Sequence, residues 1–364
     1  MKQFNEIIFL ASNRGEKLLG ILKNTHWDIA YYPFPHSRRE QISVFSEICR
    51  RALRNRPVIL ITDFFGAFPL ALFLVCKLFS CAAIVRLRGN AWIEQEDLYR
   101  DNSSWRQQIR KRQRTWLATQ LVRQADLVLP VSRALGDEML EHVAVPVANI
   151  KALPIYIDAD SGSTKTSAQL GTPTLPFLHD DDVKLIITVT SFRFWEKARG
   201  ILDFTQAFDA LSSKDPTIHW VIIGDGQYRD AIQTQVTEHA THADNIHFTG
   251  LVKDTAQWYG LGHMLVYFSY TDGLPNVLLE AGLYRLPILV NDFPPLKEVI
   301  RHNDNGLVVN AQETDVVVRA VEACLYDQTL ACRLGESAHD TVVRNYSAAA
   351  VGARFESIIR EYQT

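Results

Sequence analysis

Two acidic residues eight positions apart, Asp272 and Glu280, are the strongest candidates for chemistry in this sequence. Both follow the apolar run 264–269, and Asp272 begins a tight loop, 272–276, from which a helical pattern starts. Gly273 allows a ligand to approach the backbone closely, and the free amides at the start of a helix attract an anion. About one helical turn further on, the Glu280 carboxylate can accept two hydrogen bonds from a vicinal diol such as ribose. A plain strand–turn–helix with a solvated Glu280 is the alternative that this segment alone leaves open.

Two cations, Arg193 and Lys197, follow another apolar run. A nucleoside diphosphate gains negative charge as it leaves a sugar, and paired Arg and Lys side chains stabilise that charge without a metal. Their position just after a strand end favours a phosphate site over a solvated helix pair. A further run, 219–224, ends at Gly224 and is followed by Gly226, but the third glycine of a dehydrogenase fingerprint is missing. These residues indicate a nucleotide site, and no Asp-x-Asp pair of metal ligands follows a strand.

Several segments of the second half resemble a single family. Asp272-x7-Glu280, with Ala281-Gly282 and Leu286–Val290 after it, resembles the E-x7-E signature of the family 4 glycosyltransferases, which have the GT-B fold. Asp in place of Glu at the first position shortens that side chain by one methylene. The other matching segments are 190–200, 222–226, 248–252, 298–300 and 305–307. Because together they cover nearly all of residues 184–310, the combination is far more specific than any one segment.

The resemblance implies an α/β fold of the GT-B type, in which two doubly wound Rossmann-like domains face a central cleft. It implies a retaining enzyme that moves a hexose from a UDP- or GDP-sugar to a hydroxyl of a glycan or lipid-linked acceptor. Such reactions serve the synthesis of polysaccharides, glycolipids or glycoprotein glycans.

The resemblance also implies roles for individual residues. It places Asp272 beside the donor sugar and Arg193 and Lys197 at the diphosphate, as the catalytic group. The residues that it assigns to donor binding are Glu280, at the ribose, with Gly224, Gly226, Leu251, Gly273, Leu274, Pro275, Asn276 and Gly15. Because Arg193 and Lys197 can stabilise the diphosphate and no Asp-x-Asp pair follows a strand, we expect no metal and no cofactor, with the nucleotide sugar as the donor substrate.

The first half offers fewer candidates. Ser12–Gly15 follows the first strand, where the family has a glycine-rich loop facing the donor phosphate, but this loop contains one glycine. Arg88, Gly89 and Asn90 follow the run 82–87, where relatives often carry His-Gly. Because an arginine there can bind a phosphate, Arg88 and Asn90 are candidates for binding the acceptor or a phosphate. A surface arginine at a strand end explains this segment equally well.

The elements that must position these residues alternate between short apolar runs and longer amphipathic segments. The runs are 7–11, 58–62, 82–87, 126–130, 184–190, 219–224, 245–249, 264–269 and 287–291. Such alternation is typical of parallel, doubly wound sheets. The predicted domains are an N-terminal acceptor-binding domain, 1–157, a polar linker, 158–182, and a C-terminal nucleotide-sugar domain, 183–346. The last helix, 347–364, is predicted to cross back to the first domain.

The apolar segments and the cysteines indicate the cellular compartment in which the protein works. The longest apolar segment, 64–79, is too short and too interrupted to span a membrane, and we interpret it as a buried helix between two strands. The five cysteines are odd in number and form no C-x-x-C pair, which favours reduced thiols in a cytoplasm. The N-terminal apolar run is too short for a signal peptide. We therefore expect a cytoplasmic protein.

The charge is divided unevenly along the chain. The 364 residues carry 38 Lys and Arg against 41 Asp and Glu, a formal net charge of −3. Residues 1–155 contain 22 basic and 14 acidic residues, whereas residues 156–364 contain 16 and 27. We expect the basic half to meet an anionic partner. Drift between two solvated surfaces is the alternative.

The positive charge is densest in the segment 102–125, which contains six Arg and Lys and no acid. A helix here would place Trp105, Ile109 and Trp116 on one face, and a basic helix with tryptophans can lie on an anionic bilayer. The candidates for contact with a membrane surface are Arg106, Arg110, Lys111, Arg112 and Arg114. Two alternatives remain open: the apolar face packs on the domain core, or the helix binds nucleic acid. Because no motif for reading nucleic acid is present, we expect a peripheral protein at the inner face of the membrane and no nucleic acid partner.

Two other functions fit the same fold. A sugar-nucleotide epimerase or hydrolase would act on the donor alone, and the hydrolase would release free sugar without an acceptor. A non-catalytic nucleotide-binding scaffold would transfer no sugar to any acceptor. Transfer that depends on an acceptor distinguishes the glycosyltransferase from both.

Overall fold

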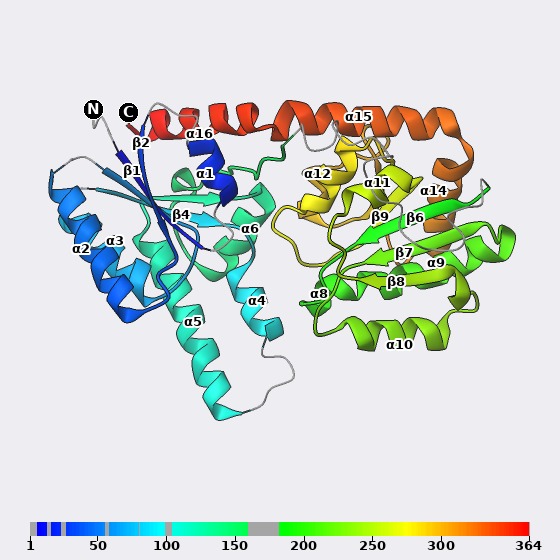
Figure 1. Cartoon of the computed structure of the whole chain (residues 1–364), viewed down its shortest axis with the longest axis horizontal. Helices are drawn as coiled ribbons and strands as arrows, with labels where there is room; N and C mark the ends of the chain where they lie inside the picture. The colour runs from blue at the N-terminus through cyan, green and yellow to red at the C-terminus, as the bar shows by residue number, and fades with distance from the viewer. Residues whose placement is uncertain are drawn as a thin grey trace. The chain divides into compact units, whose positions relative to one another are not determined.

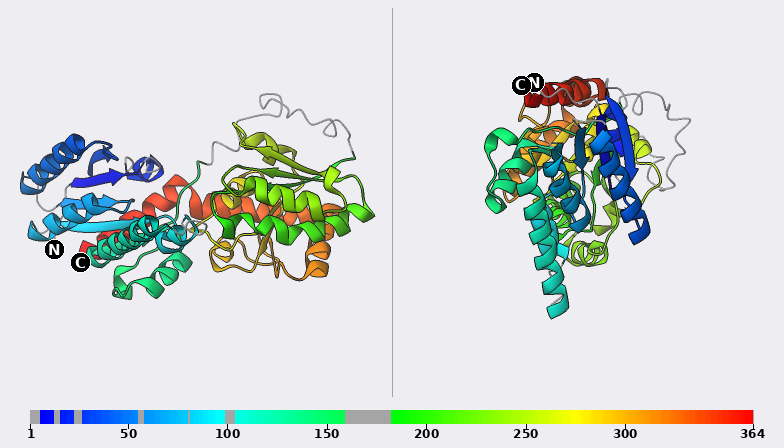
Figure 2. Two further views of the ribbon diagram at one scale, coloured as in Figure 1. Left: turned by 90° about the horizontal axis from the view of Figure 1, so that it is seen from below. Right: turned by 90° about the vertical axis from the view of Figure 1, so that its left-hand side faces the viewer.

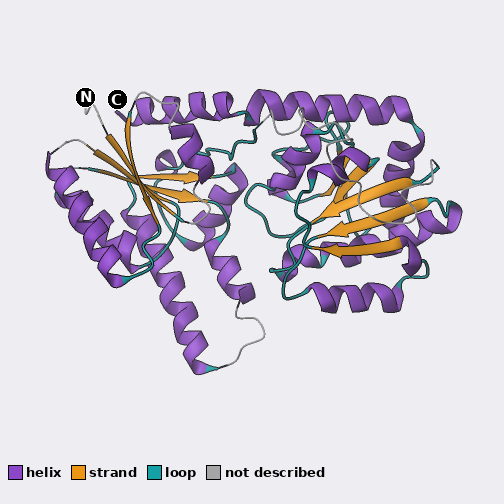
Figure 3. Ribbon diagram, in the orientation of Figure 1, coloured by secondary structure: helices purple, strands orange, loops and turns teal. Residues whose placement is uncertain are grey.

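The computed structural model describes residues 6–12, 16–22, 27–54, 58–79, 81–98, 104–158 and 182–363. Its chain divides into two compact units (Figure 1): unit 1 is residues 1–156 with 348–364, and unit 2 is residues 157–347. The predicted linker, 158–182, lies almost wholly outside the described residues. Each unit contains a sheet with helices on both faces (Figure 3), which confirms the predicted pair of doubly wound α/β domains.

Unit 1 contains a parallel five-stranded sheet in the order β2-β1-β3-β4-β5. The strands are β1 (Glu6–Ala11), β2 (Asp28–Pro33), β3 (Val58–Thr62), β4 (Ala82–Leu87) and β5 (Leu127–Pro130). The helices are α1 (Glu16–Leu22), α2 (Arg38–Arg54), α3 (Ala67–Leu78), α4 (Ala91–Leu98), α5 (Trp105–Gln124), α6 (Arg133–His142), the 3-10 helix η1 (Val147–Asn149) and α16 (Ala348–Gln363). The last helix packs on α1, and its Phe355 meets Trp27 edge to face at 5.9 Å, so α16 completes the core of unit 1.

The helices α2, α3 and α5 lie together in unit 1, with α3 packed between the other two (Figure 2). The sequence predicts a buried helix here, and this prediction is wrong for the outer side of α3. The residues that bury its inner side are Pro69, Leu72, Phe73 and Cys76. The exposed apolar residues, which we call the α3 stripe, are Ala67, Ala71, Leu74 and Leu78. Because they are spaced three or four residues apart, they form one row along the helix.

Unit 2 contains a parallel six-stranded sheet in the order β11-β10-β9-β6-β7-β8. The strands are β6 (Lys184–Val189), β7 (Ile218–Ile223), β8 (Ile246–Gly250), β9 (Met264–Tyr267), β10 (Ile288–Asn291) and β11 (Leu307–Val309). The helices are α8 (Trp195–Ala198), α9 (Gly200–Lys214), α10 (Arg229–His239), the 3-10 helix η3 (Ala243–Asn245), α11 (Ala256–Leu261), α12 (Asn276–Leu283), α13 (Pro294–Lys297), α14 (Thr314–Tyr326) and α15 (Gln328–Tyr346). Aromatic side chains join α9 to the sheet, since Phe204 and Phe208 lie 4.8 and 5.5 Å from the Trp220 ring on β7.

All nine predicted runs are strands, with ends displaced by at most two residues. The two strands that the sequence did not predict, β2 and β11, lie at sheet edges. The residues of β2 are half-buried or exposed, and β11 is three residues long. Edge strands need less apolar surface than central ones, so they leave a weaker signal in the sequence.

Candidate active site

The order of the unit 2 sheet reverses between β6 and β9, which lie side by side. From β6 the chain continues to β7 on one side, and from β9 it continues to β10 on the other. The connections that leave these strands, 190–194 and 268–275, therefore diverge. In open parallel sheets the carboxyl edge forms a crevice at this point, where ligands bind. Asp272, a predicted catalytic residue, belongs to the second connection, and Lys197, another, lies on the short helix α8 directly after the first.

The structure brings Lys197 and Asp272 together and adds a tyrosine. Asp272 Oδ2 lies 2.8 Å from Lys197 Nζ and accepts a 2.6 Å hydrogen bond from the hydroxyl of Tyr267 on β9. The other oxygen, Oδ1, accepts the N–H of Gly273 at 3.1 Å. Burial, and then the Asp272 charge, raises the pKa of Tyr267 well above its ordinary value, so this hydroxyl stays a donor. We call Lys197, Tyr267 and Asp272 the carboxyl-edge triad.

The loop that carries Asp272 is fixed at its base. The Asn291 side chain, at the end of β10, accepts from Ser269 N at 2.9 Å and donates to Ser269 O at 3.0 Å. On the other side, Gly200 lies so close that a Cβ there would be 2.0 Å from Phe268 O. Because both strand ends and α9 hold this loop, the Asp272 carboxylate is positioned before any ligand arrives.

Glu280 lies on α12, one turn after the start of that helix. Its Oε2 accepts a 2.9 Å hydrogen bond from Tyr259, whose ring stacks on Tyr284 at 5.7 Å. Burial, and then the charge of Glu280, raises the pKa of Tyr259 well above its ordinary value. No described residue donates to the second oxygen, Oε1. The side chain is half-buried, so one carboxylate oxygen of a fixed group stays available to a hydroxyl donor.

The start of α12 is suited to an anion. No side chain caps this helix, whose N-cap is Pro275, so its first amides are free to bind a negatively charged oxygen. Gly273, Leu274 and Pro275 are buried in the preceding loop, and Asn276 is exposed.

A turn after β7 packs against the connection that follows β6. Gly224 and Gly226 have φ values of +141° and +152°, which L side chains rarely adopt. A Cβ on Gly224 would lie 1.8 Å from Thr190 O, and one on Gly226 would lie 2.3 Å from the carbonyl carbon of Phe192. Both glycines therefore allow the turn after β7 to pack directly on the backbone of residues 190–193, the loop that contains Arg193.

Two predicted donor-site residues are exposed at this edge. The Arg193 guanidinium lies 5.8 Å from the Phe194 ring, and no carboxylate among the described residues pairs with it. Leu251, just after β8, is 83% exposed. An unpaired cation and an exposed apolar side chain can contact a phosphate and a base respectively.

In unit 1 the structure gives Arg88 a local partner. Its Nη1 lies 3.2 Å from Oδ2 of Asp63, a carboxylate that is 1% exposed, and 3.4 Å from Ser12 Oγ. These residues follow three neighbouring strands of the sheet. Arg88 thus neutralises the negative charge of a buried carboxylate. The sequence did not show this pairing, because Asp63 and Arg88 follow different strands.

Asn90 is a helix cap. Its Oδ1 accepts the N–H groups of Trp92 and Ile93 at 3.1 Å each, and its Nδ2 donates to Glu138 at 2.9 Å. The side chain is buried and holds the start of α4, and its predicted role in binding an acceptor or a phosphate stays a prediction. The predicted donor residue Gly15 lies outside the described residues.

The predicted membrane-surface residues lie on α5. Arg106, Arg110, Arg112 and Arg114 are exposed, and Lys111 is 4.0 Å from Glu96. The buried residues of this helix are Ala118, Leu121 and Val122, all near its end. Because Trp105 and Trp116 are 68% and 57% exposed, the alternative in which the apolar face packs on the core is wrong.

The sequence did not predict the two tyrosines that hold the site carboxylates. Tyr267 belongs to a strand that reads as apolar, and Tyr259 to the short helix α11. A tyrosine in a buried strand is a signal in itself, since its hydroxyl needs a partner there.

The part of the chain that contains these residues is similar to known glycosyltransferases. Residues 184–327 match the family model described as glycosyl transferases group 1. N-acetyl-alpha-D-glucosaminyl L-malate synthase of Bacillus anthracis is 24% identical over 237 residues, 65% of this chain and 60% of the relative. The lipopolysaccharide core biosynthesis glycosyltransferase LpsE of Rhizobium meliloti is 27% identical over 165 residues, 45% of this chain and 47% of the relative. The chain thus aligns with about half the length of these relatives.

A solved structure extends the likeness to the whole fold. HepE of Anabaena in complex with UDP superposes with a TM-score of 0.70 over 98% of this chain and 100% of that protein, at 14% identity. The predicted resemblance to family 4 glycosyltransferases of the GT-B fold is therefore confirmed, in sequence for residues 184–327 and in fold for both units. The match also supports the prediction of a glycosyltransferase domain within residues 184–327.

Proposed function

We propose that this chain, whose residues 184–327 match the glycosyl transferases group 1 family, is a retaining hexosyltransferase. It would move a hexose from a UDP- or GDP-sugar to a hydroxyl of a glycan or lipid-linked acceptor, in the synthesis of a polysaccharide or another glycoconjugate. The observation that carries this proposal is the carboxyl-edge triad, which lies at the reversal point of the unit 2 sheet, next to the uncapped start of α12.

In the proposed reaction, the second oxygen of Glu280 binds the ribose diol, and the first amides of α12 bind the diphosphate. The bond from the anomeric carbon to the diphosphate oxygen breaks, and its electron pair leaves with the diphosphate. Lys197 and Arg193 stabilise the added negative charge. Asp272 orients a hydroxyl of the sugar, while the acceptor oxygen bonds to the anomeric carbon and its proton passes to the departing diphosphate oxygen.

We propose further that this transfer needs no metal ion. The charge that a metal would neutralise is met by Lys197 and Arg193, both at the carboxyl edge. Turnover is expected to be unchanged by an excess of EDTA, and a loss of activity that Mg²⁺ or Mn²⁺ restores would contradict this part of the proposal.

We propose that the acceptor binds to unit 1. Residues 1–155, which form most of this unit, contain 22 basic and 14 acidic residues, and the arginines of α5 are exposed. The relatives include a glycosyltransferase of lipopolysaccharide core biosynthesis, and a lipid-linked acceptor of that kind would place the enzyme at the inner face of a membrane.

Binding of the donor nucleotide tests the site. We expect UDP, which is bound by HepE, to bind the wild-type chain in calorimetric titrations, with GDP as the comparison. Glu280→Gln is expected to weaken binding about 10- to 100-fold, because hydrogen bonds to a charged group are lost. Glu322→Gln is a matched control, since Glu322 is a partly exposed helix residue paired with Lys214. Equal affinity of Glu280→Gln and wild type would show that the ribose site is elsewhere.

A further inference from the structure

The α3 stripe is an apolar row on the outside of unit 1. Leu74 is 50% and Leu78 is 80% exposed, and Ala67 and Ala71 lie in the same row. α3 is twelve residues long and contains a single charged residue, Lys77. A helix that is apolar on all sides is normally buried in protein or in contact with lipid, yet the outer side of α3 is open.

Basic helices flank this row on both sides. α2 contains five Arg and two Glu, and α5 contains six Arg and Lys and no acid. The two helices add exposed apolar side chains of their own: Ile42 and Leu53 on α2, and Trp105, Ile109 and Trp116 on α5. We call the exposed side of α2, α3 and α5 the three-helix face.

The charge and the apolar side chains of the three-helix face together favour one kind of partner. Ten basic residues of the three helices are exposed, against one exposed acidic residue, Glu40. A second copy of the chain would bring two such faces together, and their like charges would repel. Nucleic acid would satisfy the cations but would leave the leucines of the α3 stripe without apolar contact. An anionic bilayer satisfies both, because phosphates bind the cations while leucine and tryptophan enter the headgroup boundary.

We propose that the three-helix face docks on an anionic phospholipid bilayer, with the α3 stripe at the centre of the contact. The contact lies at the surface, since no helix in the part of the chain that the structure describes is long and apolar enough to cross a membrane. The proposal rests on the proposed function for its purpose, which is to bring the transferase to a lipid-linked acceptor, but the docking itself needs no donor.

Flotation with vesicles tests the apolar part. One set of vesicles contains phosphatidylcholine alone, and the other contains about 30% phosphatidylglycerol. Wild type is expected to float with the anionic vesicles and not with the neutral ones. Leu74→Ser/Leu78→Ser is expected to bind anionic vesicles at least about tenfold more weakly. The variant lacks the favourable transfer of two leucine side chains from water into the bilayer.

The control pair is Val147→Ser/Val343→Ser. Val147 and Val343 are 70% and 37% exposed but lie outside α2, α3 and α5. This pair is expected to float like wild type. If the control pair loses binding while Leu74→Ser/Leu78→Ser keeps it, the α3 stripe is not the contact.

The basic part is tested by Arg106→Gln/Arg110→Gln/Arg114→Gln, which removes three exposed cations from α5. At low salt this variant is expected to bind about 100-fold more weakly, since each cation near the surface contributes about 1 kcal/mol. At high salt the difference from wild type is expected to shrink.

Two results would overturn the docking proposal. The first is equal flotation of wild type with neutral and anionic vesicles, or none with either. The second is a wild-type dimer in light scattering that Leu74→Ser/Leu78→Ser converts to a monomer, which would assign the face to a second copy. UDP affinity, measured on the same variants, is expected to stay at the wild-type value, so failure of docking and failure of the donor site are separable.

Discussion

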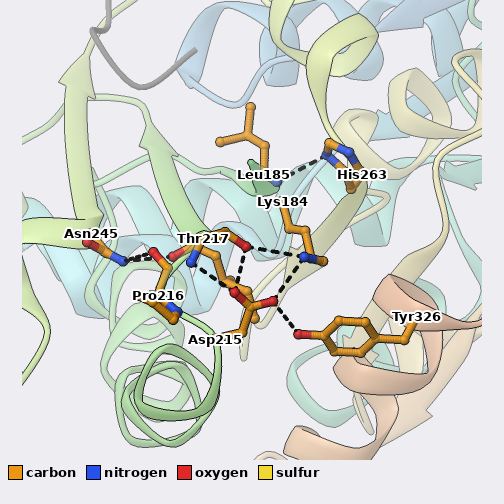
Figure 4. A network of polar contacts seen from close by, with 9 residues as sticks. Lys184, Leu185, Asp215, Pro216, Thr217, Asn245, His263 and Tyr326 are labelled. Carbon is orange, nitrogen blue, oxygen red and sulfur yellow. Dashed lines mark hydrogen bonds and ion pairs between the residues drawn. The ribbon is translucent and has the colours of Figure 1, made fainter. Parts of the chain in front are cut away.

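Two clusters in unit 2 contain the same three residue types at nearly the same distances. One is the carboxyl-edge triad. The other lies at the opposite end of the sheet, and we call it the amino-edge triad; its members are Lys184, Asp215 and Tyr326 (Figure 4). In each triad one aspartate oxygen, Oδ2, accepts the tyrosine hydroxyl at 2.6 Å and lies 2.8 or 2.9 Å from the lysine Nζ. Side-chain chemistry alone therefore does not distinguish a site from a structural contact.

The surroundings do distinguish them. Asp215 Oδ1 accepts both the N–H and the hydroxyl of Thr217, at 2.9 and 2.6 Å. Lys184 donates to the same hydroxyl at 3.2 Å, so the amino-edge triad joins the start of β6 to the turn before β7 and to the end of α14 (Figure 4). The carboxyl-edge triad instead lies where the strand order reverses, near a free Glu280 oxygen and an uncapped helix start. From this difference we infer that the carboxyl-edge triad serves the proposed donor site and that the amino-edge triad is structural.

The largest expected difference is in turnover. Asp272→Asn removes the charge that we propose to lie beside the donor sugar, and we expect kcat to fall about 1000-fold. Asp215→Asn is the matched change at the other edge and is expected to leave kcat unchanged. Sugar transfer to an acceptor, measured by release of the nucleotide, gives both values. Comparable losses in the two variants would mean that the triads do not differ in function.

The second difference is in stability against acid. Burial by itself would raise the pKa of Asp215, but hydrogen bonds from Thr217, Tyr326 and Lys184 lower it well below its ordinary value. A carboxyl whose pKa is lower in the folded chain stabilises it above the unfolded pKa of about 4, and this stabilisation is lost as the pH falls further.

Asp215→Asn is therefore expected to lower the free energy of unfolding at pH 6 by about 2 kcal/mol. The difference from wild type is expected to shrink as the pH falls below about 4. Urea unfolding at both pH values measures it, and a difference that is constant with pH would show that the ion pair contributes nothing.

The smallest difference concerns the tyrosines. Tyr267→Phe removes one hydrogen bond from Asp272, and we expect kcat to fall about tenfold with little change in KM for the donor, because Asp272 is less well positioned. Tyr326→Phe removes the matching hydroxyl at the amino edge and is expected to leave kcat unchanged. An unchanged kcat in Tyr267→Phe would assign to Tyr267 the same structural role as Tyr326.

The sequence predicted those parts of the molecule that depend on local pattern. Continuous apolar runs located the central strands, and the loop before Asn276 located the start of α12 and the place of Glu280. The resemblance located Asp272 and Lys197, but their 2.8 Å contact depends on β6 lying beside β9, which no local pattern shows.

Other features depend on packing between distant segments. The partner of Arg88 is Asp63, at the end of a neighbouring strand. The open side of α3 was not predictable either, since apolar composition indicates burial and does not show which neighbours cover a helix.

The central claim is that the carboxyl-edge triad serves the nucleotide and the amino-edge triad does not. Calorimetric titration of UDP into wild type, Lys197→Met and Lys184→Met tests it most directly, because the two variants remove the same charge from the two triads. We predict that Lys197→Met binds UDP at least about tenfold more weakly than wild type and that Lys184→Met binds it equally well. Equal affinity of all three proteins, or a loss in Lys184→Met alone, would contradict the claim.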